Sequence, residues 1–561
     1  MGLNVPGLVA SVLFYALIVA VGFWGARKRL RGGPRTTPSE DLMLGGRTVS
    51  LAVGVFTIIA TWVDGGLLSG IVEETAVRGV LWCQTAVGYS LSLFAVGALF
   101  SGPMWRAGHV TLLDPLEQAF GSRMTALLFI PALAGELFWC GAILNALGAT
   151  ASVITGLGYV TCVSVAASVV ALYTCVGGLY SITYTDVLQL LIMSFGLWVT
   201  LPFALSNDHV KPLGSLPPDQ WLGTMAPWQV PSYVDSFLMI VFGGVPWQVN
   251  YLSTGSYPTK KENRLKFKEL PVCYLGGRFL SLSPLILVGV MLQLRDERRW
   301  QDTSYSSAGG GHVSPLDDES QWSLLLALTM QHLTPTSVSF LGQGAVAAAS
   351  MSSADACMLS TGALFTKNVY VPLLRPKASE REKVWVLRSS IAVTAALSSA
   401  VAIAVDSPYG LCLLVGDMAY VMLFPQLLVA VHFPSLCNVY GSLAAFIVGL
   451  ALRSVGGEPV LGIPALFRYP FFDVETQLQL FPIKTVAMLA SLATLVIVSA
   501  VFRVALSSPR YDLLRRQFTG EAKVKAVPGE ETMDTEGDPQ EGPANCTSST
   551  LNPQTEAFSS V

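Results

Sequence analysis

The sequence predicts an all-α polytopic membrane protein with about 13 transmembrane helices. Of its 561 residues, 52% are hydrophobic and only 13% are charged, whereas a soluble chain of this size carries about 25% charged residues. The apolar residues also fall in blocks of about 20, the length that an α-helix needs to cross the hydrocarbon core. We therefore expect one transmembrane domain over residues 1–506.

Each block defines one predicted membrane segment. The segments lie at residues 6–26, 48–74, 79–103, 122–154, 157–177, 183–205, 232–253, 270–293, 323–368, 385–405, 408–432, 438–455 and 482–506. The ninth combines an external helix with the span that follows it. The first apolar run lacks a basic region before it and a small-residue cleavage site after it, so it is expected to be a retained helix rather than a signal peptide.

The basic residues indicate how these segments are oriented. The loop after the first segment holds Arg27, Lys28, Arg29, Arg31 and Arg35, and the positive-inside rule places it in the cytoplasm. The basic loops at 260–268 and 375–383 then fall on the same side. A loop with three arginines near 295–299 falls outside, although two acidic residues accompany it. Thirteen spans place the N-terminus outside and the C-terminus in the cytoplasm.

The C-terminal residues 507–561 have a different composition, which is polar and rich in Ser, Thr, Pro and acidic residues. Such a segment cannot bury a core, so it is expected to be a disordered cytoplasmic tail. Tyr511-Asp-Leu-Leu within it matches an endocytic signal for the trafficking machinery, although a frayed helix end fits equally well. The nine cysteines are scattered and predict no disulfide framework.

Two predicted spans contain residues that interrupt a membrane helix. The second contains Thr61-Trp62-Val63-Asp64-Gly65-Gly66, and the seventh contains Gly243-Gly244-Val245-Pro246-Trp247. Their positions fit two repeats of five helices, and paired breaks of this kind indicate a transporter's binding site near the bilayer midplane. The alternative is that Gly and Pro are common in membrane helices generally.

The ninth segment supplies a polar cluster, Ser350-Met351-Ser352-Ser353-Ala354-Asp355. Ser352 and Asp355 share a helix face at the i, i+3 spacing. Hard cations such as sodium prefer oxygen ligands, and an intramembrane carboxylate beside adjacent serines favours an ion site. The alternative is that the serines bond to the helix backbone one turn earlier.

Four aromatic residues lie deep in their segments rather than at the membrane interface, where tryptophan is usual. Trp62 and Trp247 stand at the two breaks, Tyr89 is central in the third segment, and Trp139 follows Glu136 by three residues on the same face. A quaternary ammonium donates no hydrogen bond, so proteins hold it against aromatic faces. Plain apolar packing remains the alternative for Tyr89 and Trp139.

Several motifs resemble a known family. Gly177-Gly178-Leu179-Tyr180, followed by Thr185-Asp186 and Gln189, is similar to the signature of the sodium:solute symporter family. The resemblance is specifically to its choline-transporting branch in these segments: Thr57-Ile-Ile-Ala-Thr-Trp62, Val87-Gly-Tyr89, Phe129-Ile-Pro-Ala-Leu, Gly135-Glu-Leu-Phe-Trp139, Leu201-Pro-Phe-Ala-Leu-Ser206, Pro246-Trp247-Gln248, Met351-Ser-Ser-Ala-Asp355 and Gly456-Gly-Glu-Pro459.

The resemblance implies the LeuT-type fold, a five-plus-five inverted repeat, and sodium-driven, chloride-dependent uptake of choline for acetylcholine synthesis. It implies a plasma-membrane transporter of the presynaptic membrane and synaptic vesicle. Trp62, Tyr89, Trp139 and Trp247 would line the choline pocket. Backbone oxygens of Ala60 and Val63 with the hydroxyls of Ser352 and Ser353 would hold sodium. We expect no enzymatic activity and no nucleic-acid partner, and a homo-oligomer is a further expected assembly.

The chain also departs from the family. Val249-Asn-Tyr-Leu-Ser-Thr-Gly-Ser-Tyr-Pro258 and the residues up to about 284 do not match it. Asp64 stands where the family has Gly, and Ala356 and Cys357 stand where it has Ser. The family's external glycosylation site is absent around Gln301.

Asp64 is the least expected of these departures. A carboxylate near the bilayer centre costs roughly 2.5–3.5 kcal/mol, so it needs a cation or open backbone amides nearby. We expect it to act as a counter-charge between the choline and sodium sites. The alternative is that it caps the second half-helix at Gly65-Gly66.

Three other functions compete with choline uptake. A symporter for a sugar, iodide or a monocarboxylate would not need four deep aromatic residues, and an anion carrier would not tolerate Asp64. An intramembrane aspartyl protease could use Asp355 and Asp417, but Leu414-Val-Gly-Asp417 lacks the Gly-x-Gly-Asp pattern. A homologue that binds choline without transporting it is suggested by the altered residues 249–284.

The predicted topology can be tested with epitope tags on intact cells. A tag at the N-terminus should be accessible from outside, and a tag at Val561 only after permeabilisation. If both ends were accessible from one side, one span would be missing, and 270–293 would be the first candidate.

Overall fold

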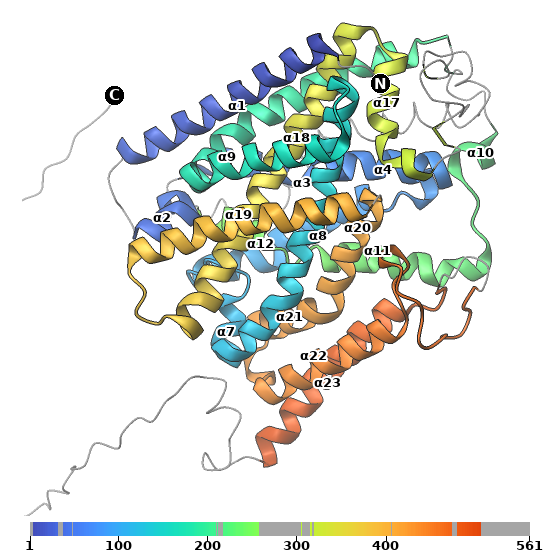
Figure 1. The fold of residues 1–561 in the computed structure, drawn as a ribbon. Helices are drawn as coiled ribbons and strands as arrows, with labels where there is room; N and C mark the ends of the chain where they lie inside the picture. The colour runs from blue at the N-terminus through green and yellow to red at the C-terminus, as the bar shows by residue number, and fades with distance from the viewer. Residues whose placement is uncertain are drawn as a thin grey trace, which may run out of the picture. The chain divides into compact units, whose positions relative to one another are not determined.

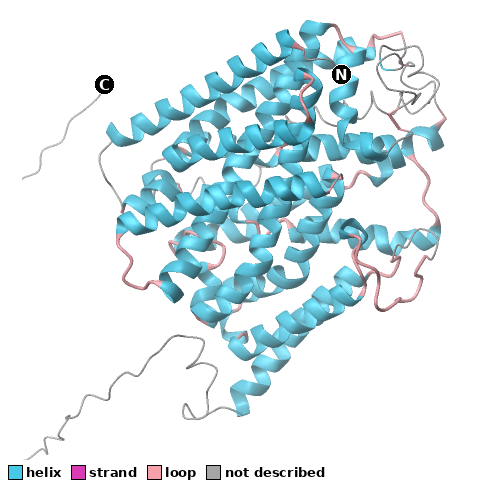
Figure 2. Cartoon of the chain, in the orientation of Figure 1, coloured by secondary structure: helices cyan, strands magenta, loops and turns pink. Residues whose placement is uncertain are grey.

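The computed structural model describes residues 4–31, 37–47, 49–208, 210, 217–256, 305, 315–316, 319–405, 407–473 and 479–505. Within these ranges the structure is helical, with isolated bridges but no strand (Figures 1 and 2). The N-terminal half contains α1 (Val5–Arg31), α2 (Pro38–Leu44), α3 (Leu51–Trp62), α4 (Gly65–Arg78), α5 (Thr85–Ala95), α6 (Ser101–Arg106), α7 (Asp114–Phe120), α8 (Ser122–Thr155), α9 (Tyr159–Leu205), α10 (Pro218–Leu222), α11 (Val230–Gly243) and α12 (Gln248–Gly255). The C-terminal half contains α17 (Leu325–Leu333), α18 (Thr336–Phe365), α19 (Glu380–Ala404), α20 (Pro408–Met418), α21 (Phe424–His432), α22 (Val439–Val455) and α23 (Ile483–Ala505).

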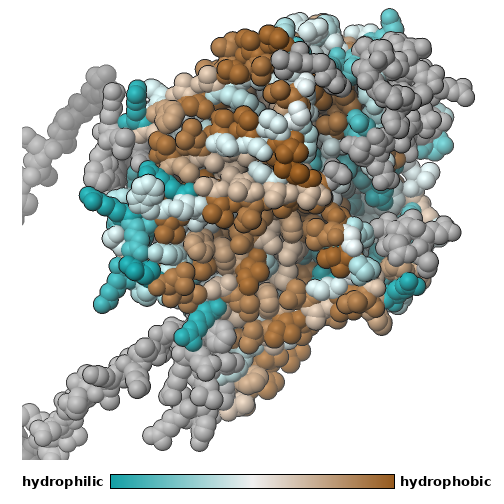
Figure 3. Space-filling view, in the orientation of Figure 1, coloured by the Kyte–Doolittle hydropathy of each residue, from teal (hydrophilic) through white to brown (hydrophobic). Residues whose placement is uncertain are grey.

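Seven helical runs in the described part of the chain are long and apolar enough to cross a membrane. They are Val5–Arg27, Val80–Arg106, Ser122–Thr155, Tyr159–Leu205, Glu380–Ala404, Pro408–His432 and Ile483–Ala505. Large apolar side chains are exposed along them, such as Leu13 of α1, Phe195 of α9 and Ile497 of α23. Figure 3 shows a broad apolar surface over the middle of one face, with hydrophilic residues gathered at its left and right edges. The bilayer accounts for this pattern, because apolar side chains facing lipid cost nothing in solvation.

Twelve of the predicted segments coincide with a helix or a pair of helices. The eighth, 270–293, lies outside the described residues, so the total of 13 stays a prediction. The predicted segments at 157–177 and 183–205 form the single run α9, which bends at Gly178. The boundary between residues 506 and 507 also stays a prediction, because the description ends at residue 505.

Both predicted breaks are present. Residues 63–64 separate α3 from α4, and residues 244–247 separate α11 from α12. With 12 and 14 residues, α3 and α4 reach about 18 and 21 Å at 1.5 Å per residue. Each is therefore too short to cross the roughly 30 Å hydrocarbon core alone. A Cβ at Gly65 would overlap the Ser350 hydroxyl, so the absence of a side chain lets α18 approach this break.

Three long helices form the scaffold around the breaks. The helix α18 packs along α9 and α8, and α1 packs along α9 (Figure 1). Nearly every residue of α18 from Ala345 to Leu364 is buried. Because α18 also contacts α3, α4 and α12, its polar cluster at residues 350–355 lies beside the broken spans.

Gly178 gives α9 its bend, with φ of 57° and ψ of −154°. A residue with a Cβ pays roughly 1–2 kcal/mol for a left-handed conformation. A Cβ here would also overlap the backbone oxygen and side chain of Leu42, at the end of α2. Glycine at this position is therefore required both by the bend and by the close packing of α2.

We expect Gly178→Ala to lower the melting temperature of the detergent-solubilised protein, because strain and overlap add to a cost above about 2 kcal/mol. Gly344→Ala is the matched control, since a Cβ at Gly344 meets nothing within 4 Å. The control should be unchanged or slightly more stable. Equal melting temperatures for the two variants would contradict this account of the bend.

Candidate functional site

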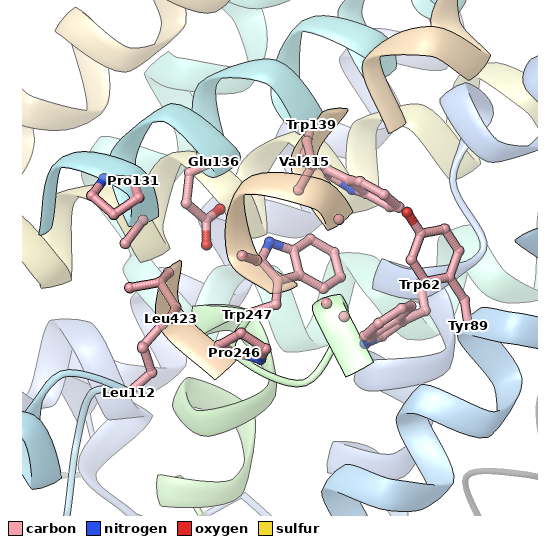
Figure 4. A pocket seen from close by; sticks show the side chains of 16 residues that line it. Trp62, Tyr89, Leu112, Pro131, Glu136, Trp139, Pro246, Trp247, Val415 and Leu423 are labelled. Atoms are coloured by element: carbon pink, nitrogen blue, oxygen red, sulfur yellow. The ribbon is translucent and has the colours of Figure 1, made fainter. Parts of the chain in front are cut away.

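The four aromatic residues predicted from the sequence form one cluster (Figure 4). The ring centroid of Trp62 lies 4.8 Å from that of Trp247, 5.5 Å from Tyr89 and 6.4 Å from Trp139. Trp139 lies 4.8 Å from Trp247 and 5.4 Å from Tyr89. All four side chains are buried. We call these four residues the aromatic cage.

The two breaks and two intact helices position the cage. Trp62 ends α3, and Trp247 immediately precedes α12. The indole N–H of Trp62 donates to the Asn250 side-chain oxygen at 2.8 Å, and the Tyr89 hydroxyl donates to the Cys412 carbonyl at 2.9 Å. Asn250 belongs to the stretch that departs from the family pattern, so this departure supplies a direct contact to the cage.

A cavity of about 20 Å³ lies between the cage and the neighbouring helices. That volume holds about one water molecule. Besides the cage, residues of α8, α11 and α20 line it, including Pro131, Gly135, Gly243 and Val415. Among the described residues that line it, Glu136 is the only charged one. The rings contact one another, so a larger ligand requires them to move apart.

Asp64 begins α4. Its side-chain Oδ1 accepts a hydrogen bond at 2.6 Å from the backbone N–H of Leu67, which is the geometry of a helix N-cap. Asp64 is fully buried but is not among the residues that line the cavity of the cage. The capping contact that the sequence suggested as an alternative is thus present, and the role of Asp64 as a counter-charge stays a prediction.

The residues predicted to bind sodium separate into two groups. In the first, the Ser353 hydroxyl lies 2.7 Å from the carbonyl oxygen of Thr61 and 3.4 Å from that of Ala60. The last carbonyls of a helix lack partners within it, and Val63 continues the chain directly after this turn. This group therefore brings α18 hydroxyl and α3 carbonyl oxygens to one place.

In the second group, Ser352 and Asp355 both face α9. The Ser352 hydroxyl donates to Asp186 Oδ1 at 2.7 Å, and the Tyr173 hydroxyl donates to Asp355 Oδ2 at 2.8 Å. The shared face predicted for Ser352 and Asp355 is observed, but it points toward α9 rather than toward Ala60. Asp186 and Tyr173 were not predicted as site residues, because only the pairing of α9 with α18 places them there.

A second missed feature is a polar network where Asp114 and Glu117 of α7, between the third and fourth predicted spans, meet residues just after α18. Lys367 Nζ lies 2.5 Å from Asp114 Oδ2, and Asn368 donates to Asp114 and Glu117. Burial alone would raise the pKa of Asp114, but Lys367 and the hydrogen bonds lower it below its usual value. Gln248 of α12 accepts from the Leu112 backbone N–H at 2.7 Å. Because Gln248 directly follows Trp247, this contact joins the loop before α7 to the cage.

A family model for the sodium:solute symporter family matches residues 42–209 and 312–449. The chain belongs to this family. The symporter is 44% identical over 517 residues to a fly (Drosophila melanogaster) protein named high-affinity choline transporter 1, covering 91% of this chain and 81% of that protein. It is 41% identical over 509 residues to the human protein of that name, covering 89% and 85%. A Caenorhabditis elegans relative with the same name is 39% identical over 518 residues, covering 91% and 88%.

A solved structure titled as a substrate-bound, outward-open Na⁺-coupled sialic acid symporter has the same fold. Its TM-score is 0.66 at 16% sequence identity, covering 89% of this chain and 98% of that one. The symporter therefore has the LeuT-type five-plus-five helical fold that the family resemblance predicts, and it is a multi-pass membrane protein. The helix breaks lie at corresponding positions of the two repeats.

The counter-charge role of Asp64 is tested with Asp64→Asn. Asparagine caps a helix as well as aspartate does, so the variant removes the charge and keeps the Leu67 contact. We expect the half-saturating concentration of sodium, choline or both in uptake assays to rise several-fold, with unchanged surface expression. Asp64→Ala, which also loses the cap, is the control for helix stability. Unchanged half-saturation for both ligands in Asp64→Asn would leave capping as the role of this residue.

Proposed function

We propose that this symporter carries choline across the plasma membrane, driven by sodium. The aromatic cage is the observation that carries the proposal. Four buried rings meet at the two helix breaks, and relatives with 39%, 41% and 44% identity are named for choline transport. A quaternary ammonium fits such a cage because it can bind ring faces without donating a hydrogen bond.

The energetics support a cation as substrate. Each contact between an ammonium and a ring contributes roughly 0.5–2 kcal/mol, and more where water is excluded. The cage leaves room for only about one water molecule in this arrangement, since its cavity is about 20 Å³. Choline binding then requires Trp62 and Trp247 to separate, and both stand at breaks where the backbone can change direction. Alternating access in this fold works by such movements around a fixed central site.

In the proposal, sodium binds beside the cage. Its ligands include the carbonyl oxygens of Ala60 and Val63 and the Ser353 hydroxyl. Ser352 and Asp355 follow on α18 and face α9. The last turn of α3 then carries both the sodium ligands and Trp62. Sodium binding would fix the position of this turn, and choline binding requires the same position. The two binding events would therefore be coupled, as a symporter needs.

The remaining parts of the proposal follow from the family resemblance. Uptake would depend on chloride and supply acetylcholine synthesis. The transporter would be located in the presynaptic membrane and in synaptic vesicles. The N-terminus would lie outside and the tail in the cytoplasm, where Tyr511-Asp-Leu-Leu would meet the trafficking machinery. The proposal also includes assembly as a homo-oligomer, and it assigns no enzymatic activity.

Radiolabelled choline uptake into cells expressing the full chain tests the proposal. We expect uptake in sodium, little in lithium or N-methylglucamine, and a decrease when gluconate replaces chloride. Trp62→Ala and Trp247→Ala should nearly abolish uptake, and Trp→Phe should lose less, because a weaker ring face remains.

Trp198→Ala is the control, since Trp198 is exposed on the apolar surface of α9. It should keep normal uptake at normal surface expression. Sodium-dependent choline binding without uptake would instead identify a homologue that binds but does not transport. Equal loss of uptake from Leu and from Phe at Trp62 and Trp247 would argue for packing rather than cation–π binding, because only Phe keeps a ring face.

A further inference from the structure

Glu136 is a buried carboxylate that none of the predicted roles uses. It lies in the middle of α8, one turn before Trp139, with 2% of its surface exposed. Figure 4 shows its carboxylate directed toward Trp247, on the side of that ring away from Trp62 and Tyr89, and Glu136 lines the cavity beside the cage. No arginine, lysine or histidine is among the residues that line this cavity.

The carboxylate oxygens of Glu136 have no hydrogen-bond partner among the described residues. The Trp247 indole N–H, the Cys357 thiol and the Gln248 backbone N–H are its polar neighbours, but none of them completes hydrogen-bond geometry with it. The indole N–H groups of Trp247 and Trp139 are likewise without an acceptor. A buried charge left in this state is strongly unfavourable unless something else compensates it.

We infer that Glu136 binds the cationic head of the transported amine as its counter-charge within the aromatic cage. The inference rests on the proposed function and adds a charged residue to a cage otherwise made of rings. The rings recognise the shape and polarisability of a methylated ammonium, whereas a carboxylate distinguishes its positive charge from a neutral group of the same shape. In a site with little water, the attraction between the carboxylate and the ammonium is strong even when one aromatic ring lies between them.

The position of Glu136 separates its role from that of Asp64. Asp64 caps α4, adjoins the carbonyls proposed to bind sodium, and does not line the cavity. Glu136 lines the cavity and is three residues from Trp139 on the same helix. Two cations would thus have two carboxylates, one beside the α3 carbonyls and one on the wall of the cavity beside the cage.

A purely structural alternative is that Glu136 holds Trp247 in place by accepting from its indole N–H. Glu136→Gln tests this alternative, because glutamine keeps the size and one acceptor oxygen but removes the charge. The discriminating ligand is 3,3-dimethylbutan-1-ol, in which carbon replaces the choline nitrogen. A residue that only positions Trp247 would affect both ligands alike.

The experiment uses the full-length protein in lipid nanodiscs with saturating sodium, titrated with each ligand and followed by tryptophan fluorescence. We expect Glu136→Gln to weaken choline binding by about tenfold or more and to change binding of the neutral alcohol by less than about twofold. Glu136→Asp should recover part of the choline affinity because it keeps the charge. Trp62→Ala is the control and should weaken both ligands, because it removes ring surface that either ligand contacts.

Equal changes for choline and the neutral alcohol in Glu136→Gln, or no change in either, would overturn the inference. If Glu136→Gln does not fold, Glu136→Asp decides instead: a loss confined to choline supports a charge contact, and equal losses exclude it. A wild-type protein that binds no choline at all would contradict the proposed function itself, which is a separate outcome from a failure of the Glu136 assignment.

Discussion

The break in the second span is the constraint on which the rest of the site depends. Inside a bilayer no water satisfies backbone groups, so non-helical backbone persists only where protein or a polar cavity surrounds it. Here the Ser353 hydroxyl reaches the carbonyls of Ala60 and Thr61, and the Asp64 side chain caps the next half-helix at Leu67. The Ser353 contacts require α18 close to α3, which Gly65 permits because it has no side chain.

The second break connects the cage to the polar network near α7. Trp247 is followed directly by Gln248, whose side chain accepts from the Leu112 backbone, and Leu112 itself lines the cavity of the cage. Two residues further along, Asp114 pairs with Lys367 just beyond α18. A movement of Trp247 therefore displaces a loop tied to α18, the helix that carries the hydroxyls proposed for sodium. The predicted topology places this network at the cytoplasmic end, where a transporter must close while its substrate enters from outside.

The sequence predicted the elements of this site better than their pairing. Apolar blocks and paired Gly/Pro interruptions located the spans and both breaks, because bilayer thickness and backbone satisfaction are local constraints. The cage was predicted from four aromatic residues far apart in the chain, and they do meet. The orientation of Ser352 and Asp355 toward Asp186 and Tyr173 could not be predicted, since a helix face says nothing about which helix packs against it.

Glu136 illustrates the same limit of prediction from sequence, because its surroundings depend on helix packing. An intramembrane carboxylate three residues from a deep tryptophan was visible in the sequence, but its position on the cavity wall depends on how α8 packs against α20. Asn250 is a similar case, because its contact with the Trp62 indole depends on the fold of a stretch that departs from the family pattern.

The charge of the substrate is the physical reason why these few side chains, rather than the helical framework, would determine specificity. The sialic acid symporter has the same fold at only 16% identity, so the helical framework by itself does not choose between an acid and an ammonium. The rings of the cage would present negative potential to a bound cation, and an ionised carboxylate on the cavity wall would add a full negative charge. An anionic substrate would be repelled by both, whereas a methylated ammonium would be stabilised by both. Selectivity for cations then requires no change in the scaffold, only the side chains that two broken helices and α8 present to one small cavity.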